Sequence, residues 1–336
     1  MILVTGSTGL LGSHLLYKLA SQNKNIRALY RTEDKLDLVK NVFATYTAKS
    51  DSLFNSIEWV KADILDIPAL TNAFKAVNYV YHCAALVSFD PNDYPYLRKT
   101  NIEGTANIVN LCLAHKIEKL CYVSSVATLG SALKNELTTE ETYWNPEDDN
   151  NVYAITKYGA EMEVWRASQE GLPVVIVKPG VILGAGVWNQ GSGSLFTKAH
   201  KGLRFYPKGN SGLVDVKDVA DAMIQLLKSD IKNEAFILVS ENWNYKHFLQ
   251  ALATSVGAKP PSTLAPTWVL AVLWRLDWLK NALTGTPRQL TKQLAASIMS
   301  KSHYSNAKIK TALHFKFKPV QESINEIGAI FQKQVE

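Results

Sequence analysis

The chain has 336 residues, of which 47% are hydrophobic and 20% are charged. This composition excludes a disordered or low-complexity chain, and the length predicts about two domains, or one large domain with an appendage. The formal net charge of +6 is modest and scattered, with no run of Lys and Arg. The sequence therefore predicts no nucleic-acid partner.

The cysteines and the apolar stretches indicate in which cellular compartment we expect the protein. Cys83, Cys112 and Cys121 lie among apolar residues and lack the spacing of a disulfide framework or a metal site. We expect them to be small buried side chains in a reducing compartment, with no metal bound. No basic, cleavable leader opens the chain, and the apolar stretch 264–283 contains three charged residues. The sequence predicts a soluble, cytoplasmic protein without a transmembrane segment.

Strand and helix patterns alternate along most of the chain. Apolar runs predict about seven strands, at Ile2–Thr5, Ile26–Tyr30, Ile57–Val60, Val77–His82, Lys119–Ser124, Pro173–Val177 and Ala235–Val239. Helical periodicity predicts helices around Leu11–Leu19 and at Pro68–Lys75, Asn101–His115, Val152–Gln169 and Asp215–Leu227. Because the strands are continuous apolar runs separated by helices, we expect an α/β fold with a parallel sheet covered on both faces.

The alternation of strands and helices changes past Gly180: residues 184–213 are rich in glycine and weakly periodic, and the chain from Tyr245 onward is mostly helical. We predict that 1–180 and 214–240 form the sheet domain. Residues 181–213 and 241–336 would form a smaller lobe over the carboxyl ends of the strands, where open α/β sheets bind ligands.

A Trp-rich stretch lies within this second lobe. Trp268, Trp274 and Trp278 are interleaved with leucines over 264–283. Core packing is the default interpretation, because aromatic and leucine stripes at helical spacing are ordinary cores. A pocket wall and a membrane or partner face are the alternatives.

The first chemical motif is the segment Thr5-Gly6-Ser7-Thr8-Gly9-Leu10-Leu11-Gly12. Glycines allow a tight turn and a close approach of the backbone to a pyrophosphate, and the following helix directs its positive end at that charge. The motif lies between a strand pattern and an amphipathic helix, which is the context that a dinucleotide site requires. The glycine spacing resembles that of the short-chain dehydrogenase/reductase superfamily.

The second motif is Tyr153-Ala154-Ile155-Thr156-Lys157. Tyr and Lys four residues apart share a helix face, so we expect the cation to lower the pKa of the phenol and make it a usable acid or base. Tyr304 and Lys308 form a second pair with this spacing, but no comparable serine precedes them. Neighbouring serines end the strand before Tyr153, and strand periodicity alone does not decide which of them faces it.

These motifs, taken in order, resemble the extended short-chain dehydrogenases, the NAD(P)-dependent epimerase/dehydratase group, over nearly the whole chain. His82-Cys83-Ala84-Ala85, Asn101 in Thr100–Thr105, Pro179–Gly184 and Asp215–Ala220 are similar to further motifs of that family. The resemblance implies a Rossmann-type, doubly wound sheet. It implies cofactor contacts from Gly6, Thr8, Gly9, Leu10, Leu11, Gly12, Tyr30, Arg31, Asp63, Ile64, Ala84, Ala85, Asn101, Tyr153, Lys157, Pro179 and Val181.

The resemblance also implies the catalytic roles. The family's active hydroxyl lies five residues before the glycine of its segment, so Gly130 selects Ser125 rather than Ser124. Ser125, Tyr153 and Lys157 would then form the catalytic triplet. Lys178 stands where the family usually has arginine and lacks the guanidinium fork, so no role is assigned to it.

The end of the second strand bears on the choice of cofactor. An NAD site needs a carboxylate there for the ribose hydroxyls, whereas this chain has Tyr30-Arg31, and a cation suits a 2′-phosphate. Glu33 and Asp34 follow closely and could compete with the cation. The sequence favours NADP(H) over NAD(H).

Three functions are compatible with these motifs. The first is an alcohol dehydrogenase or carbonyl reductase similar to the dihydroflavonol reductase and 3β-hydroxysteroid dehydrogenase branch, acting on a small apolar or aromatic substrate. The second is a nucleotide-sugar epimerase or dehydratase, although segment 209–218 lacks the family's Arg-Asp pair. The third is a non-catalytic dinucleotide sensor, whose relatives generally lack the Tyr/Lys pair. A homodimer is a further expectation of the resemblance.

Overall fold

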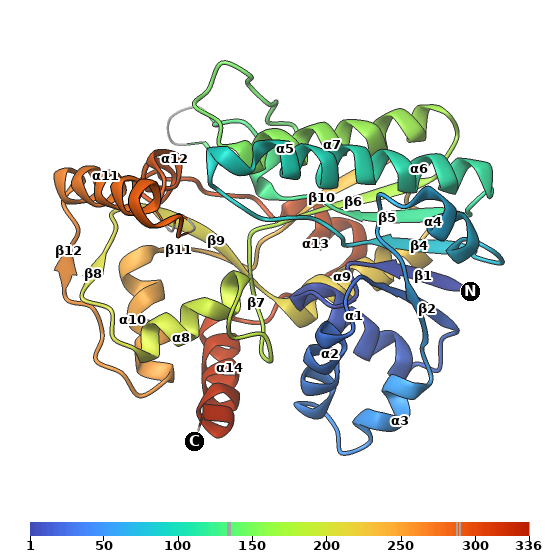
Figure 1. Cartoon of the computed structure of the whole chain (residues 1–336), viewed down its shortest axis with the longest axis horizontal. Helices are drawn as coiled ribbons and strands as arrows, with labels where there is room; N and C mark the ends of the chain where they lie inside the picture. The colour runs from blue at the N-terminus through green and yellow to red at the C-terminus, as the bar shows by residue number, and fades with distance from the viewer. Residues whose placement is uncertain (133–135, 287, 289, 336) are drawn as a thin grey trace.

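The computed structural model describes residues 1–132, 136–286, 288 and 290–335. A seven-stranded sheet with strand order β10-β6-β5-β4-β1-β2-β3 forms its larger part, and every pair of neighbouring strands is parallel (Figure 1). The strands are β1 (Ile2–Thr5), β2 (Ile26–Tyr30), β3 (Glu58–Lys61), β4 (Tyr79–His82), β5 (Lys119–Val123), β6 (Val174–Pro179) and β10 (Glu234–Leu238). The predicted fold class, a Rossmann-type doubly wound sheet, is confirmed.

Helices cover both faces of this sheet (Figure 1). The helices α5, α6 and α7 lie on one face, and α1, α2 and α9 lie on the other. The helices of this part are α1 (Leu10–Ser21), α2 (Asp34–Ala44), α3 (Ser50–Asn55), α4 (Ile67–Ala73), α5 (Tyr94–Leu97), α6 (Gly104–Ala114), α7 (Val152–Gln169) and α9 (Val216–Lys228). The chain adds β2 and β3 on one side of β1 and β4 to β6 on the other, so a topological switch point lies between β1 and β4.

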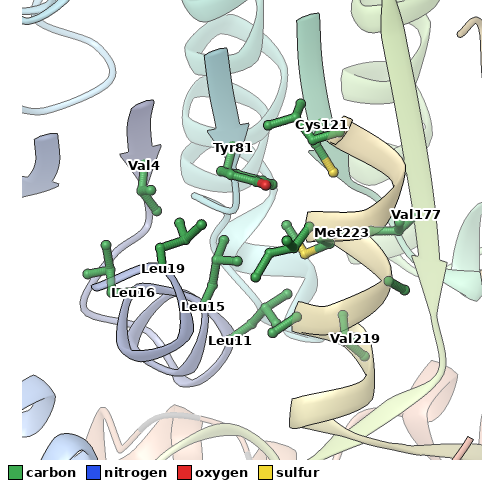
Figure 2. Close-up of a cluster of buried hydrophobic side chains, with 14 of the residues drawn as sticks. Val4, Leu11, Leu15, Leu16, Leu19, Tyr81, Cys121, Val177, Val219 and Met223 are labelled. Carbon is green, nitrogen blue, oxygen red and sulfur yellow. The ribbon is translucent and has the colours of Figure 1, made fainter. Parts of the chain in front are cut away.

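The apolar stripe of α1 fixes the glycine loop that precedes it. Leu11, Leu15 and Leu19 are buried against Val4 of β1 and Met223 of α9 (Figure 2). Burying a leucine side chain contributes about 1.5–3 kcal/mol, so this stripe holds the first turn of α1 firmly against the carboxyl end of β1.

The predicted boundaries agree with the structure to within about two residues, apart from one helix. The segment predicted as a single helix from Asn101 is π-helical over Arg98–Glu103 and becomes α-helical only at Gly104. Single-turn π segments inside α-helices are frequent at functional sites, and this one carries Asn101.

The cysteines lie in the core as expected. Cys112 and Cys121 are buried and Cys83 is half-buried. Burial raises the pKa of all three thiols above the ordinary value. Neutral, weakly reactive thiols follow from that shift.

The second part of the chain forms a smaller lobe around a three-stranded sheet of order β11-β9-β7, with a short β12-β8 pair beside it. Its core contains Phe196, Phe248, Leu252 and Phe331. The elements are β7 (Val181–Leu183), α8 (Ser194–His200), β8 (Phe205–Tyr206), β9 (Asn210–Asp215), β11 (Glu241–Asn244), α10 (Tyr245–Ser255), β12 (Thr263–Leu264), α11 (Thr267–Thr284), α12 (Lys292–Ser297), α13 (Ala307–Leu313) and α14 (Val320–Val335). Ile309 of α13 belongs instead to the core of the large sheet, and the exact division into domains stays a proposal.

The Trp-rich stretch forms α11, and its predicted role as core packing is wrong. Leu270 is the one buried residue of this helix, whereas Trp268 and Trp278 are exposed. Both faces of α11 are apolar, and periodicity alone does not show which of two apolar faces packs inward. Within the described part of the chain, we find no helix with the length and hydropathy needed to cross a membrane.

Candidate active site

One cavity of about 460 Å³ opens at the carboxyl ends of the large sheet. It is lined by the glycine loop, the ends of β2, β4, β5 and β6, the first two turns of α7, and the segment 187–192 of the smaller lobe. The glycine loop and the turn after β4 lie on either side of the topological switch point, which is where open α/β sheets bind ligands.

The glycine loop is shaped for a close approach of backbone groups. Gly6 adopts φ +65°, and a Cβ atom at this position would lie 2.5 Å from the backbone nitrogen of Ala84. A Cβ atom at Gly12 would collide with the carbonyl oxygen of Gly6. No side chain caps the start of α1 and no acidic residue lies in its first turn. The positive end of the helix is therefore available to an anion at the cavity.

His82 fixes the turn on the other side of the cavity. Its Nδ1 atom is 2.7 Å from the Thr5 hydroxyl and its Nε2 atom is 3.0 Å from the Thr105 hydroxyl, and the Ala84 N–H also donates to Thr5. Burial lowers the pKa of His82 to about 3. A neutral imidazole thus ties β1, β4 and α6 together next to the glycine loop.

Asn101 holds the chain that follows this turn. Its side-chain amide accepts a hydrogen bond from the Leu86 N–H (2.7 Å) and donates to the Leu86 carbonyl (3.0 Å) and to the Thr156 hydroxyl (3.2 Å). Asn101 is buried and does not line the cavity. It connects the π-helical segment, the cavity wall and α7.

Ser125, Tyr153 and Lys157 all line the same cavity. The Ser125 oxygen accepts a hydrogen bond from the Ala127 N–H, and its hydroxyl is hydrogen-bonded to the Tyr153 phenol. Lys157 donates to Tyr122 Oη (2.7 Å) and to the Val123 carbonyl (2.8 Å). The fold therefore brings together the serine, tyrosine and lysine that the sequence singled out.

The expected lowering of the Tyr153 pKa is not what the protein environment produces. Burial raises the pKa of Tyr153 above its ordinary value, and the hydrogen bond from Ser125 offsets only part of this rise. Burial also lowers the pKa of Lys157 to about 7, which weakens the cation on which the expected effect depended. Tyr153 is therefore a protonated phenol at neutral pH, suited to donate a proton.

Ser124 faces away from Tyr153. Its hydroxyl donates to Glu161 Oε2 (2.5 Å), and the same carboxylate receives hydrogen bonds from Thr128 (2.9 Å) and Lys178 (2.6 Å to Oε1). All four side chains are buried. Lys178 thus has a buried carboxylate partner that the sequence did not reveal.

The other Tyr/Lys pair serves a different purpose. Lys308 forms an ion pair with Glu234 (2.5 Å), and the Tyr304 phenol is hydrogen-bonded to Ser302. Neither Tyr304 nor Lys308 lines the cavity.

Most of the residues predicted for the cofactor meet at the cavity, and three do not. Asp63 accepts a hydrogen bond from the Leu65 N–H and lies 3.7 Å from Arg31, while Val181 packs towards the core of the smaller lobe. With Asn101, these two lie outside the lining. The predicted residues in the lining are Gly6, Thr8, Gly9, Leu10, Leu11, Gly12, Tyr30, Arg31, Ile64, Ala84, Ala85, Tyr153, Lys157 and Pro179.

Several lining residues were missed by the sequence analysis. Lys35 lies in a polar segment without a motif, and Val187, Gln190 and Ser192 come from a glycine-rich loop without periodicity. Lys35 and Arg31 both follow β2, so the spacing of cations after that strand was the available signal. Among the described residues, no cluster of three or more His, Cys, Asp or Glu side chains could hold a metal ion.

The sequence and the fold both have relatives among known proteins. A Synechocystis sp. protein named "Putative dihydroflavonol 4-reductase" is 29% identical over 281 residues, which cover 81% of this chain and 77% of that protein. The crystal structure of gox2253 is similar with a TM-score of 0.81 at 26% identity, covering 99% of this chain and 98% of the other. The Thermus thermophilus UDP-glucose 4-epimerase, in complex with NAD, has a TM-score of 0.74 at 22% identity, with 98% of each chain covered.

A family model described as the NAD dependent epimerase/dehydratase family matches residues 2–238. Among the described residues, all those that line the cavity, from Gly6 to Ser192, fall within this range. The glycine loop, the buried His82 turn and the Ser125–Tyr153–Lys157 group all fall within it. The chain therefore belongs to the NAD dependent epimerase/dehydratase family.

Proposed function

We propose that the protein is an NADPH-dependent oxidoreductase that reduces a small, apolar or aromatic carbonyl compound to an alcohol. The observation that carries this proposal is the charge of the cavity. Among the described lining residues, the Lys and Arg side chains are Arg31 and Lys35 beside β2, and Lys157 beside Tyr153. Segment 187–192, which faces the site from the smaller lobe, supplies none.

A nucleotide-sugar substrate carries a diphosphate, and enzymes bind such a group with cations or helix N-termini. Beyond Ser125, Tyr153 and Lys157, the described lining also includes the polar but uncharged side chains of Thr100, Ser124, Gln190 and Ser192. Its remaining walls include Val87, Ile182 and Val187. An uncharged carbonyl substrate fits these walls better than a diphosphate.

An aromatic ring also stands beside the reacting phenol. The Phe89 ring centroid lies 5.7 Å from that of Tyr153 in an edge-to-face arrangement. Phe89 is not among the described lining residues, so it gives Tyr153 an apolar neighbour rather than forming a cavity wall. The similarity to a protein named as a dihydroflavonol reductase supports the same substrate class.

Ser125, Tyr153 and Lys157 would each have a separate role in the reduction of the carbonyl group. A nicotinamide held in this cavity would supply the hydride for reduction of the carbonyl carbon. Tyr153 would donate its phenolic proton to the carbonyl oxygen, and Ser125 would hydrogen-bond the same oxygen. Lys157 would hold the ribose hydroxyls and stabilise the phenolate that remains. The raised pKa of Tyr153 favours this direction, because the acid form of the phenol is the one present at neutral pH.

The end of the cavity formed by the glycine loop and the residues after β2 fits a dinucleotide. Gly6 and Gly12 leave no room for a Cβ atom, and the uncapped start of α1 offers its positive end to a pyrophosphate. Arg31 and Lys35 would border the adenosine ribose of a dinucleotide bound along the glycine loop, and no described lining residue is acidic. Glu33 pairs with Lys61 (3.6 Å) outside the lining. Asp63, also outside the lining, lies 3.7 Å from Arg31. The two cations of the lining favour the 2′-phosphate of NADPH.

The test is a titration of the protein with NADPH and NADH, followed by turnover assays. Aromatic and aliphatic aldehydes and ketones are compared with UDP- and dTDP-sugars under the same conditions. We expect tighter binding of NADPH and net consumption of NADPH with a carbonyl compound. Conversion of a nucleotide sugar without net consumption of cofactor would show an epimerase instead.

A further inference from the structure

Helix α11 presents an apolar stripe to solvent. Trp268, Val272, Leu276, Leu279 and Leu283 follow one another at helical spacing of four, four, three and four residues, so they lie on one face. Their exposed fractions are 69%, 46%, 55%, 46% and 76%. A helix on the surface of a soluble protein normally turns polar side chains outward. We call these five residues the α11 patch.

The opposite face of α11 attaches the helix to the protein. Leu270 packs with Ala265 and Ala295 in a small buried cluster, with Trp274 partly buried against it. Figure 1 shows α11 and α12 together at the edge of the smaller lobe. The α11 patch therefore faces away from the lobe and does not line the cavity.

Positive charge accompanies this patch. Residues 259–301 contain six Lys and Arg residues and one acidic residue, which gives this segment a formal net charge of +5. Arg288 and Asp277 lie 3.7 Å apart and are largely buried, so they offset each other. The five remaining cations are exposed: Lys259, Arg275, Lys280, Lys292 and Lys301.

Two of these cations lie on α11 itself, and a third begins the helix that packs against it. Arg275 stacks its guanidinium over the ring of Trp274, 4.4 Å from the ring centroid. Lys280 is exposed beside the apolar stripe, and Lys292 is the first residue of α12. Long cationic side chains next to an apolar stripe with tryptophans are typical of helices that lie in a membrane interface.

We propose that the α11 patch docks on the surface of an anionic phospholipid bilayer, with α11 lying in the plane of the interface. Charge decides between this occupant and a second copy of the chain. A symmetric dimer through the patch would bring the same positive segment of both copies together, and like charges across an interface are unfavourable. An anionic lipid surface has the complementary charge and accepts the apolar side chains.

The geometry agrees with a helix that lies on the membrane. From Trp268 to Leu283 the stripe extends over about 22 Å at 1.5 Å per residue, along the helix axis. Because the apolar residues form a stripe along this axis, all five can enter the interface together when the helix lies flat. Arg275 and Lys280 then remain at the level of the headgroups.

The experiment is co-sedimentation of the full-length protein with vesicles of phosphatidylcholine alone, or of phosphatidylcholine mixed with phosphatidylglycerol. We expect binding to the mixed vesicles at low ionic strength and weaker binding in high salt. The double variant Trp268→Ser/Leu276→Ser should lose at least about tenfold in vesicle affinity, because it removes two apolar side chains from the interface. Ile67→Ser is the matched control, because Ile67 is 53% exposed on α4, outside the patch.

A charge variant separates the two contributions. Arg275→Gln/Lys280→Gln should weaken binding to the mixed vesicles. Lys24→Gln should not, because Lys24 is exposed and lies far from α11 in the sequence. Circular dichroism and NADPH titration of each variant verify the fold. Should the double serine variant fail these checks, Leu283→Ser at the exposed end of the helix takes its place.

Two results would overturn the proposal. The first is that the wild-type protein does not bind the mixed vesicles at low ionic strength. If ultracentrifugation then shows a dimer that Leu283→Ser dissociates, the patch is a contact between two copies of the chain instead. The other is vesicle binding that the patch variants leave unchanged.

Discussion

Lys178 Nζ lies 2.6 Å from Glu161 Oε1, and both side chains are about 95% buried between β6 and α7. Thr128 donates to the other carboxylate oxygen, which also receives the Ser124 hydroxyl. Glu161 is one helical turn after Lys157 and raises the pKa of that lysine, in opposition to burial. The charge of a residue in the candidate active site therefore depends on an ion pair behind it.

Replacing one member of this pair should destabilise the fold. Glu161→Gln leaves the Lys178 cation buried without its countercharge, and breaking a buried pair costs about 3–5 kcal/mol. We expect the free energy of unfolding in urea to fall by this order. Glu170→Gln on the same helix is the control, because Glu170 forms an exposed pair with Arg166, and such pairs contribute about 0.2–1 kcal/mol. Equal effects of the two variants would contradict the buried pair.

Substitution of Ser125 should lower the catalytic rate, whereas substitution of Ser124 should lower the stability of the fold. Ser125→Ala removes a hydrogen bond to Tyr153, and loss of such a donor lowers kcat by about 10²–10³ in comparable sites. Ser124→Ala instead removes a donor from Glu161, so we expect about 1–3 kcal/mol lower stability with little change in kcat. Steady-state kinetics and urea denaturation of both variants test this. The reverse pattern would assign the active hydroxyl to Ser124.

The raised pKa of Tyr153 predicts opposite pH profiles for the two directions of the reaction. Carbonyl reduction needs the protonated phenol, so its kcat/KM should stay level from neutral pH through the ordinary phenol range, because the raised pKa moves loss of the proton above that range. Alcohol oxidation needs the phenolate and should rise about tenfold per pH unit over the same range. A plateau of the oxidation rate already near neutral pH would show that the bound complex lowers this pKa.

Arg31 should determine much of the preference for NADPH. Arg31→Ala removes a charge-assisted contact with the 2′-phosphate, worth about 1.5–3 kcal/mol. We expect NADPH affinity to fall by the corresponding factor and NADH affinity to change little, as measured by fluorescence titration. Lys61→Ala is the control, because Lys61 pairs with Glu33 outside the cavity. Equal affinities of the unmodified protein for both cofactors would remove the basis of this prediction.

The sequence predicted the sheet and the glycine loop well because their signals are local. The strand Ile26–Tyr30 and the helix Val152–Gln169 were predicted with their observed bounds, since continuous apolar runs and helical periodicity depend on neighbouring residues alone. The choice of Ser125 over Ser124 as the partner of Tyr153 came from the family resemblance at Gly130, because strand periodicity alone does not decide between them.

Tertiary packing determined what the sequence could not predict. The pKa of Tyr153 depends on how much surrounding chain excludes water, and that chain includes distant segments. The carboxylate partner of Lys178 comes from the helix that precedes its strand, and its contact depends on how the two elements pack. Helix α11 has apolar residues all around, so its pattern could not show that Leu270 faces inward and Trp268 outward.

The most direct test of the proposed function follows the reduced nicotinamide by its absorbance while the protein acts on a carbonyl substrate found by the screen. We expect one NADPH to be consumed for each alcohol formed. Tyr153→Phe should slow this reaction by about 10²–10⁴ while binding NADPH as well as the unmodified protein, and Tyr304→Phe should leave it unchanged. Full activity of Tyr153→Phe, or turnover of a UDP-sugar without any net loss of NADPH, would contradict the assignment.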